Sequence, residues 1–308
     1  MSLPQEFHEL AKKVNNWGRW GKDDEIGTIN LITPEVVRKG AACIRNGKRF
    51  SLALPLSVNG PQMGVIPGRI NPVRTMVAIN DSMSGDPSEF CTSDDIVTMG
   101  LQAATHWDSL AHVSYDNRLY NGFPASSITA HGAARCGIDK IKTIAGRGVL
   151  LDVARAQGRD RLEPGYALTA QDLDAACELA RVTVEPGDIV LLRTGQIQLL
   201  HAGDKMAYTF PNPGPSTMTV EWFHDHDVAA VATDSLTFEV YPCEREDVVL
   251  PVHLLHLVEM GMTQGQNFDL EELAADCADD SVYQFFLEAS PEPFEGGVGT
   301  PVNPVAIK

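Results

Sequence analysis

The chain has few basic residues and no long apolar run, and these two absences exclude several classes of function. It carries 24 Lys and Arg against 41 Asp and Glu in 308 residues, a formal net charge of −17 at pH 7. Nucleic acids and anionic membranes bind clustered cationic side chains, so we expect neither as a partner. No segment approaches the roughly 20 apolar residues that cross a bilayer, and residues 1–8 lack the basic start and apolar core of a signal peptide. We therefore predict a cytoplasmic location.

Close-paired cysteines and several enzyme motifs are also missing. The six cysteines have no spacing that suits a disulfide framework or a zinc knuckle, so we expect scattered buried thiols. The sequence contains no Gly-x-Ser-x-Gly, no glycine-rich phosphate loop ahead of Lys-Ser or Lys-Thr, and no dinucleotide-binding glycine pattern. A serine hydrolase, a nucleotide-dependent enzyme and a nicotinamide dehydrogenase are therefore poorly supported.

What the chain does contain is an alternation of apolar strands and helices. Residues 148–152, 188–193 and 228–232 are short apolar runs typical of buried central strands. Residues 33–44 and 169–180 predict helices, and each begins with a threonine that can cap the first turn. Strands that alternate with helices indicate an α/β fold, and an apolar content of 44% is ample for its core.

Residues 100–112 gather two histidines and one carboxylate into a run that is otherwise nearly free of charge, Gly-Leu-Gln-Ala-Ala-Thr-His-Trp-Asp-Ser-Leu-Ala-His. This run and residues 95–99 before it favour a strand, in which alternate side chains share a face. The even-numbered members, which a strand would point to one side, are Gln102, His106, Asp108 and His112.

The spacing of His106 and Asp108 suits a shared metal ion. A rise of roughly 3.3 Å per residue places their α-carbons about 6–7 Å apart, so both side chains can reach one cation. Gln102 and His112 are too far from His106 in a straight strand, and the chain has to bend if either is to join them. Imidazole and carboxylate suit zinc, manganese or acid and base chemistry alike. A strand-end Asp-Ser pair is also typical of a plain turn or helix cap, so the segment alone leaves both interpretations open.

The same segment resembles the His-x-Gly-Thr-His-x-Asp-x-Pro-x-His motif of the putative cyclase family, which includes bacterial kynurenine formamidases and isatin hydrolases. The matching residues are Thr105, His106, Asp108 and His112. The departures are Gln102 for the first histidine, Ala104 for the glycine and Leu110 for the proline. Further segments that resemble the longer bacterial members follow in order at residues 16–21, 23–30, 120–122, 146–152, 186–195, 232–239, 251–253 and 267–273.

The resemblance implies an architecture and an assembly. The expected fold is a mixed, partly open β-barrel surrounded by helices, of the swivelling β/β/α type. Residues 1–308 would form a single domain, with an N-terminal arm over about 1–48 and an extended C-terminal tail over about 291–308. A homodimer or homotetramer is expected. The candidates for contact with a small-molecule substrate are Trp17 and Trp20 in the arm and Trp107 in the motif.

The resemblance also implies a ligand set for a divalent metal, manganese or zinc. It consists of His106 and Asp108, with Gln102 and Gln266 supplying amide oxygens. Gln266 stands where many relatives have glutamate, and His253 where the family has its C-terminal site histidine. An amide neither takes up a proton near neutral pH nor cancels metal charge, so the two glutamines leave metal retention open. An oxygen-rich set shifts preference from zinc toward manganese or magnesium.

The function implied by the resemblance is a metal-dependent hydrolase that opens, or in reverse closes, an amide, a lactam or a lactone. Metal-activated water would attack the carbonyl, with His112 as general base or acid and His253 as a second catalytic residue. One alternative is a metal-free cyclase or dehydratase-type enzyme that uses His112. Another is a non-catalytic ligand-binding member of the fold, against which the retained His106, Asp108 and His112 argue.

Overall fold

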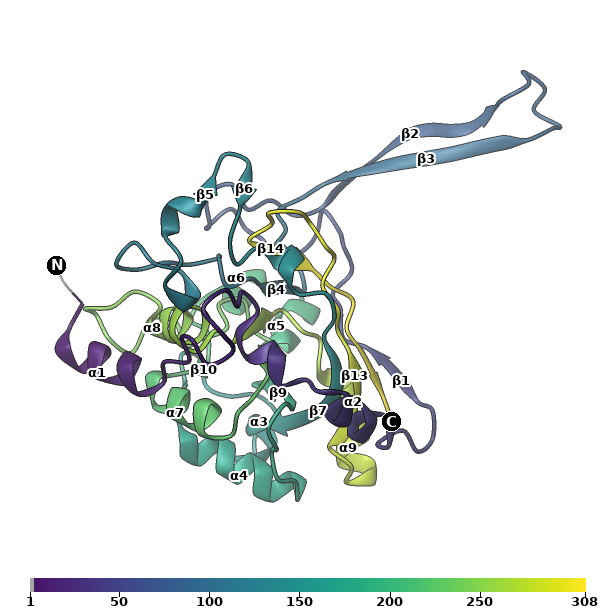
Figure 1. Cartoon of the computed structure of the whole chain (residues 1–308). Helices are drawn as coiled ribbons and strands as arrows, with labels where there is room; N and C mark the ends of the chain where they lie inside the picture. Colours follow the sequence, from purple (N-terminus) through teal and green to yellow (C-terminus); the bar gives the residue numbers. More distant parts are fainter. Residues whose placement is uncertain (1–2) are drawn as a thin grey trace.

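A mixed sheet of nine strands forms the centre of the computed structural model, which describes residues 3–308 (Figure 1). Four neighbouring strands are parallel: β7 (Ala145–Asp152), β9 (Ile189–Arg193), β11 (Ala230–Thr233) and β12 (Thr263–Gln266). Beyond β12 lie the antiparallel strands β4 (His106–Asp108) and β14 (Gly299–Pro301). Beyond β7 lie β13 (Gln284–Glu288), β15 (Val305–Ile307) and β1 (Arg49–Ser51), also antiparallel.

The central strands are apolar throughout because both faces of the sheet are covered. In β7, Val149 and Leu151 enter one hydrophobic core, while Leu150 between them enters a second core on the other face. All five residues of β9 are buried, and residues 189–192 alternate between the two cores in the same way. Continuous apolar runs are what a parallel sheet with two covered faces requires, and the strands predicted from those runs are confirmed.

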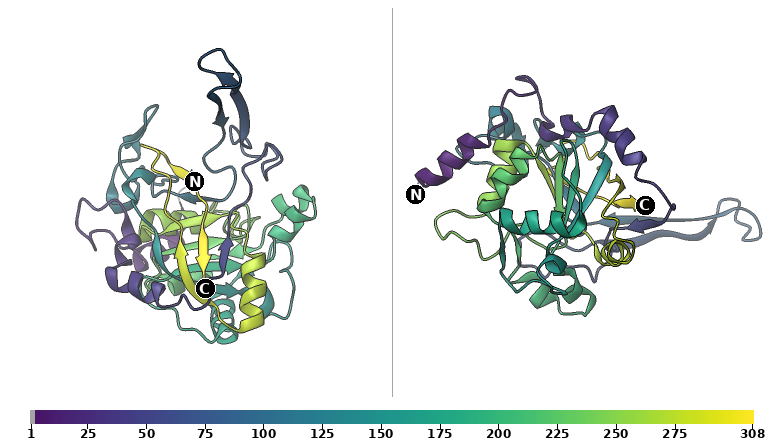
Figure 2. Two further views of the ribbon diagram at one scale, coloured as in Figure 1. Left: turned by 90° about the vertical axis from the view of Figure 1, so that its right-hand side faces the viewer. Right: turned by 90° about the horizontal axis from the view of Figure 1, so that it is seen from below.

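Helices cover the two faces of the sheet (Figures 1 and 2). The first core is closed by α1 (Gln5–Lys13), α3 (Val153–Ala156), α4 (Ala170–Ala180), α7 (Thr217–Asp225) and the π-helix Leu254–Met260. The second core is closed by α9 (Glu271–Asp280). Thr169 caps α4 in a capping box with Asp172, and Thr33 caps α2 (Pro34–Ala41), which ends three residues earlier than the sequence predicts. No helix among residues 3–308 is long and apolar enough to cross a membrane.

Short elements connect these layers. They are η1 (Gly27–Leu31), η2 (Tyr120–Gly122), η3 (Ala125–Ser127), η4 (Ile138–Lys140), α5 (Ile197–His201), α6 (Lys205–Thr209), α8 (Pro251–His253), and the strand pairs β5 (Ile128–Thr129) with β6 (Gly132–Ala133) and β8 (Ala167–Leu168) with β10 (Gly214–Pro215). The mixed, half-barrel sheet surrounded by helices confirms the predicted fold class.

Two segments differ from the sequence predictions. Residues 95–99 do not continue into the motif strand: they end β3 (Cys91–Thr98), which pairs only with β2 (Val73–Ser82) in a hairpin that extends away from the body (Figure 1). A turn at residues 100–105 then separates β3 from β4, so the motif is not one straight strand. The C-terminal residues supply β14 and β15 to the main sheet rather than leaving it as a tail.

His256 is buried beside the first hydrophobic core, and neither of its ring nitrogens forms a hydrogen bond with residues 3–308. It lies on the π-helix, edge-on to Phe223 and Phe238 at ring-centroid distances of 5.4 and 5.5 Å. Burial lowers the pKa of His256 to about 3, and the neighbouring His253 acts in the same direction. The imidazole is therefore a neutral core residue at physiological pH.

We expect His256→Gln to change the pH dependence of stability. The pKa of an unfolded histidine is near 6.5, so below that pH the unfolded chain takes up a proton that the folded one refuses, and the stabilising contribution of His256 is lost as pH falls. The free energy of unfolding of the wild type should decline relative to the variant by about 1.4 kcal/mol per pH unit between about pH 6 and 4. Denaturant unfolding measures this; the exposed His131→Gln is the control, and parallel wild-type and His256→Gln curves would contradict the prediction.

Candidate active site

Strand β4 places His106 and Asp108 on the same face of the sheet. It is held on both sides, since His106 pairs with Gln266 of β12 and with Pro301 of β14. Both side chains are fully buried. The alternation of a strand points Trp107 to the other face, where it is also fully buried, packs on Phe268 and donates a hydrogen bond to the Ala289 carbonyl at 2.8 Å. Trp107 is therefore a core residue and does not line the site.

Three imidazoles converge on the Asp108 carboxylate. His106 Nε2 lies 3.5 Å and His112 Nε2 3.6 Å from Asp108 Oδ1, and His253 Nε2 lies 3.9 Å from Asp108 Oδ2. His112 returns to the strand because the chain turns after Asp108, with a hydrogen bond from the His112 amide to the Ser109 carbonyl. Its side chain is 19% exposed while Asp108 is sealed, so His112 is the member of this cluster that faces outward.

The far nitrogens of two imidazoles are held by hydrogen bonds, which fixes the rings. His106 Nδ1 lies 2.7 Å from the Ala104 carbonyl, which also accepts a bond from the Asn267 amide. His253 Nδ1 lies 2.5 Å from Glu239 Oε1, and the Glu239 carboxylate also accepts from the backbone of residues 252 and 253. In both rings Nδ1 carries the proton, and Nε2 presents a lone pair to the cluster.

Glu239 and Gln264 were not assigned roles from the sequence. Glu239 is buried and reaches His253 across 14 residues of chain, so no local pattern marks it. Gln264 lies two residues before Gln266 on β12, and both amides approach Asp108 Oδ2, at 3.4 and 2.7 Å. Side chains two residues apart on a strand point to the same face, so Gln264 can be placed on the face of Gln266 once β12 is known to be a strand.

Within residues 3–308, no side-chain hydrogen bond joins the remaining predicted site residues to the cluster. Gln102 lies in the turn before β4, where its Nε2 is buried without a hydrogen-bond partner and packs on the backbone at Gly299. Trp17 donates to the Val258 carbonyl at 2.7 Å, and Trp20 stacks under the Arg19 guanidinium at 4.8 Å. The structure therefore joins His106, Asp108, His112, His253 and Gln266 into one group.

Arg69 is a further charged residue near this group. It is half-buried in the loop before β2, and its stem lies against the turn at Gly100, whose amide bonds to the Ile70 carbonyl. No carboxylate of residues 3–308 forms an ion pair with it. Burial lowers the pKa of Arg69, and the negative charge of Asp108 opposes that shift. The guanidinium therefore interacts electrostatically with the carboxylate of the cluster. Arginine is always charged, so this positive charge is available to an anionic group of a ligand.

The charges of Asp108 and His112 are set by their surroundings. Burial raises the pKa of Asp108, but the nearby His112, His106 and His253 outweigh burial and hold it below its usual range. Burial lowers the pKa of His112 more than Asp108 raises it, and the other cationic groups, including Arg69, add to the lowering. Asp108 is therefore ionised and His112 neutral near pH 7, the states of a ligand or anchor and of a base.

The donor atoms left free fit a divalent cation. His106 Nε2 and Asp108 Oδ1 are buried, have no hydrogen-bond partner and lie 3.5 Å apart. Unpaired buried atoms of this kind are rare unless something else binds them, and nitrogen with carboxylate oxygen is a set that zinc or manganese accepts. Within residues 3–308, however, no group of three or more His, Cys, Asp or Glu side chains is arranged to hold a metal. The free donor atoms are of a type that suits a divalent cation, but Asp108 is the one carboxylate among the candidate ligands.

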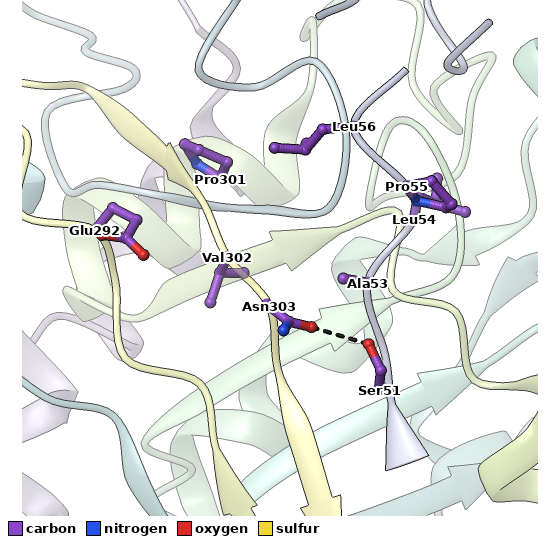
Figure 3. A pocket seen from close by; sticks show the side chains of 9 residues that line it. All are labelled: Ser51, Ala53, Leu54, Pro55, Leu56, Glu292, Pro301, Val302 and Asn303. Atoms are coloured by element: carbon purple, nitrogen blue, oxygen red, sulfur yellow. Dashed lines mark hydrogen bonds between the residues drawn. The ribbon is translucent and has the colours of Figure 1, made fainter. Parts of the chain in front are cut away.

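A cavity of about 480 Å³ opens at the edge of the sheet, next to the strand that pairs with β4. It is lined by residues that include Leu54, Val302 and Pro301, whose backbone pairs with His106 (Figure 3). Its lining carries one titratable side chain, Glu292, and no imidazole. We therefore place the candidate chemistry at the histidine cluster, where the unpaired donors are.

Comparison with known proteins identifies the family. The putative cyclase family model matches residues 13–240. A crystal structure described as a novel cyclase is 40% identical, covers 96% of this chain and 99% of its own, and superposes with a TM-score of 0.87. Isatin hydrolase A from Ralstonia solanacearum is 20% identical over 90% of this chain and 98% of its own, with a TM-score of 0.63. Isatin hydrolase A from Labrenzia aggregata, bound to benzyl benzoate, is 17% identical over 86% and 94%, with a TM-score of 0.62.

No curated protein sequence matches this chain. The two isatin hydrolases share its fold at low identity, whereas the family model spans most of the chain and the 40% identical structure spans nearly all of it. The motif around His106 and Asp108, the half-barrel sheet and these matches agree, and the chain belongs to the cyclase family.

Proposed function

We propose that this protein is a metal-dependent hydrolase that opens a cyclic amide or lactone, or cleaves an acyl amide, at the cluster around Asp108. The observation that carries this proposal is the convergence of three imidazoles on one buried carboxylate with donor atoms left free. The fold relatives include isatin hydrolases and a potential metal-dependent hydrolase with cyclase activity. Isatin, a cyclic amide, is therefore the first compound to test.

His106 and Asp108 would hold the metal, with His253 and Gln266 beside them. A bound manganese or zinc ion supplies Lewis acidity, which polarises the substrate carbonyl and makes water acidic at neutral pH. The Glu239 carboxylate accepts a hydrogen bond from Nδ1–H of His253 and so raises the basicity of Nε2, the nitrogen that faces the cluster. The Gln266 amide donates to Asp108 Oδ2 and holds that carboxylate in place.

His112 moves the proton in this scheme. It is neutral near pH 7, faces outward and lies beside the carboxylate, and its Nδ1 has no hydrogen-bond partner. A neutral imidazole in this position accepts a proton from the attacking water and returns it to the leaving nitrogen or oxygen as the ring opens. Arg69 is placed to bind the negative charge that develops on the substrate or is already present on it.

A metal-free reaction is the second candidate, and the glutamines favour it. At 2.7 Å the Gln266 amide occupies one oxygen of Asp108, which a cation would otherwise use. His112 and His253 would then activate water or a substrate hydroxyl, with amide groups stabilising the oxyanion, as in a cyclisation or dehydration. A ligand-binding member without catalysis is excluded if turnover depends on His112.

Metal content separates the first two candidates. We expect protein purified without chelator, after growth with added manganese and zinc, to carry close to one equivalent of metal by elemental mass spectrometry. His106→Ala/Asp108→Ala should lose it, because both free donors disappear. His201→Ala/Asp269→Ala removes an equivalent pair, 2.9 Å apart at the surface, and should keep the metal.

Gln266→Glu extends this experiment, because a carboxylate there adds the anionic ligand that the set lacks. It should bind manganese at least tenfold more tightly in calorimetric titration. Wild-type protein with metal no higher than in the double variant would sink the metal-dependent scheme and leave the metal-free one.

His112→Asn should lower kcat by about 10²- to 10⁴-fold while metal content and thermal unfolding stay unchanged, since general acid and base catalysis typically contributes that much. Loss of the isatin absorbance, or of the absorbance of another lactam or lactone that proves active, measures the rate. Replacement of the exposed His131 by Asn is the matched control. Wild-type rates in His112→Asn would mean that another group carries the proton.

Arg69→Met should raise KM for an anionic or strongly polarised substrate by about 10- to 100-fold, because a charge-assisted hydrogen bond contributes about 1.5–3 kcal/mol. Arg69→Lys should recover part of this loss, since it keeps the charge but not the planar fork. Arg45→Met, at an exposed position, controls for a general change in charge. Unchanged KM and kcat in Arg69→Met would remove Arg69 from the site.

A further inference from the structure

An apolar groove of about 300 Å³ opens on the surface of the body. One wall is formed by Val65 and Ile66, from the loop that precedes β2, and the other by Val249 and Leu250, which lead into α8. The remaining lining residues come from the end of α6 and from the segments after α6 and β11: Thr209, Phe210, Leu236, Thr237 and Tyr241. Residues that are far apart in the sequence therefore meet at one surface.

The groove offers a ligand apolar contacts and few polar ones. Apart from its two threonines, its lining residues are aliphatic or aromatic. Thr209 Oγ1 donates to the Lys205 carbonyl at 2.7 Å, and Thr237 Oγ1 donates to the Glu239 carbonyl at 2.8 Å. Both hydroxyl hydrogens are therefore used within the protein. A polar group in this groove would lose hydrogen bonds to water with little in return, so the groove favours an apolar group.

Contacts within the protein itself hold the groove in shape. The fully buried Asn212 exchanges two backbone hydrogen bonds with Tyr241, and its side chain accepts one from the Leu236 amide at 3.2 Å. The Leu250 amide donates to Cys243 Sγ at 3.3 Å, which fixes the end of the other segment. Ligand sites are usually preformed in this way, with a mostly apolar lining and volumes of about 300–1,000 Å³.

The wall at Leu250 is continuous with the support of His253. Leu250 immediately precedes α8, and His253 is the third residue of that helix, about 4.5 Å further along its axis. The Thr237 carbonyl accepts a backbone hydrogen bond from Glu239, whose carboxylate holds His253 Nδ1. A ligand in the groove therefore lies beside the segments that position this imidazole.

The wall at Ile66 is continuous with the turn that leads into β4. The Ile66 carbonyl accepts a hydrogen bond from the amide of Arg69, whose charge interacts with Asp108. In the same loop, Gln62 Nε2 donates to the carbonyl of Ala103 in that turn at 3.0 Å. Both walls therefore belong to segments that carry or support residues of the candidate site. A molecule whose carbonyl reaches the cluster can extend a side chain into the groove.

We propose that the groove binds an apolar substituent of the substrate, an alkyl or aryl side chain next to the amide or lactone group. This inference rests on the proposed function, because it names the substrate class of the same site. The volume suits such a group: an engineered cavity of about 150 Å³ binds benzene, so about 300 Å³ accommodates roughly twice as many carbon atoms. The protein therefore prefers amides and lactones that carry such a side chain to the bare ring or a short acyl group.

The length of an alkyl side chain gives a quantitative expectation. A fully buried methylene group strengthens binding about fourfold. The groove is open to solvent, with Val65 and Val249 65% and 76% exposed, so we expect about two- to fourfold per methylene. Four added methylenes should then strengthen binding by at least about 16-fold.

Calorimetric titration of the purified protein with butanamide, hexanamide and octanamide tests the proposal. The dissociation constant of the wild type should fall at least about 16-fold from butanamide to octanamide. Val65→Ser/Val249→Ser makes both walls polar, and Phe210→Ser removes an aromatic ring; each should reduce this ratio to about fourfold or less. Leu179→Ser/Met218→Ser replaces two exposed apolar residues on α4 and α7 and should keep the wild-type ratio. Circular dichroism of each variant confirms its fold.

Turnover is measured separately with isatin and with γ-hexalactone and γ-decalactone, whose side chains differ by four methylenes. Equal affinity of the wild type for butanamide and octanamide would overturn the inference, as would groove variants that keep the wild-type ratio. Groove variants that keep the ratio but change the sedimentation coefficient would assign the groove to contact with another protein chain instead. A steep, groove-dependent ratio without turnover of isatin or either lactone supports the groove and removes the hydrolase assignment. Isatin hydrolysis with a flat ratio does the reverse.

Discussion

A carboxylate placed in a protein core has to be compensated, and the compensation of Asp108 organises the candidate site. Its side chain has no solvent exposure, yet its pKa stays below the usual range because imidazoles surround it and an amide donates to it. Each of those neighbours comes from a different part of the chain: β4, the turn after it, α8 and β12. The contacts of one buried carboxylate therefore join four segments of the chain.

The neighbours of Asp108 are themselves fixed by contacts made outside the cluster. Glu239 locks His253, while the Ala104 carbonyl accepts a hydrogen bond from the His106 ring and is itself held by the Asn267 amide. Tyr208 extends the contacts around His106 by donating a hydrogen bond to the Asn267 side chain at 2.6 Å. Such outer contacts set which ring nitrogen carries the proton, and through that they decide whether the site presents donors or lone pairs.

The two glutamines distinguish this chain within the family pattern. A glutamate at position 266 would repel the Asp108 carboxylate, whereas the Gln266 amide donates a hydrogen bond to it. The amide is uncharged, so it does not neutralise the charge of a metal. Among residues 3–308, Gln102 Nε2 has no hydrogen-bond partner, and it packs at Gly299, the β14 residue that pairs with Asp108. Relative to the family pattern the site keeps His106, His112 and His253 but lacks an imidazole at 102 and a carboxylate at 266, a change that should weaken metal binding more than acid and base chemistry.

Much of the fold was predictable, because apolar runs and helix caps are local signals. The runs ending at Asp152 and Arg193 became β7 and β9, and Thr169 capped α4. The hairpin was not predicted, since its strands bury no face and so carry no consistent alternation. Trp107 was predicted to contact the substrate because it lies between His106 and Asp108 in the motif. Adjacent side chains of a strand point to opposite faces, however, and Trp107 packs in the second hydrophobic core.

By itself the sequence determined the family, the central α/β arrangement and the pairing of His106 with Asp108, because each depends on residues close together in the chain. Only the tertiary structure decided how closely His112 and His253 approach Asp108, and that Glu239 orients His253. Those contacts join residues from separate strands and turns, and their distances follow from the register of β4 against β12 and β14. Sequence spacing does not contain that register, because it is set by packing of the whole sheet.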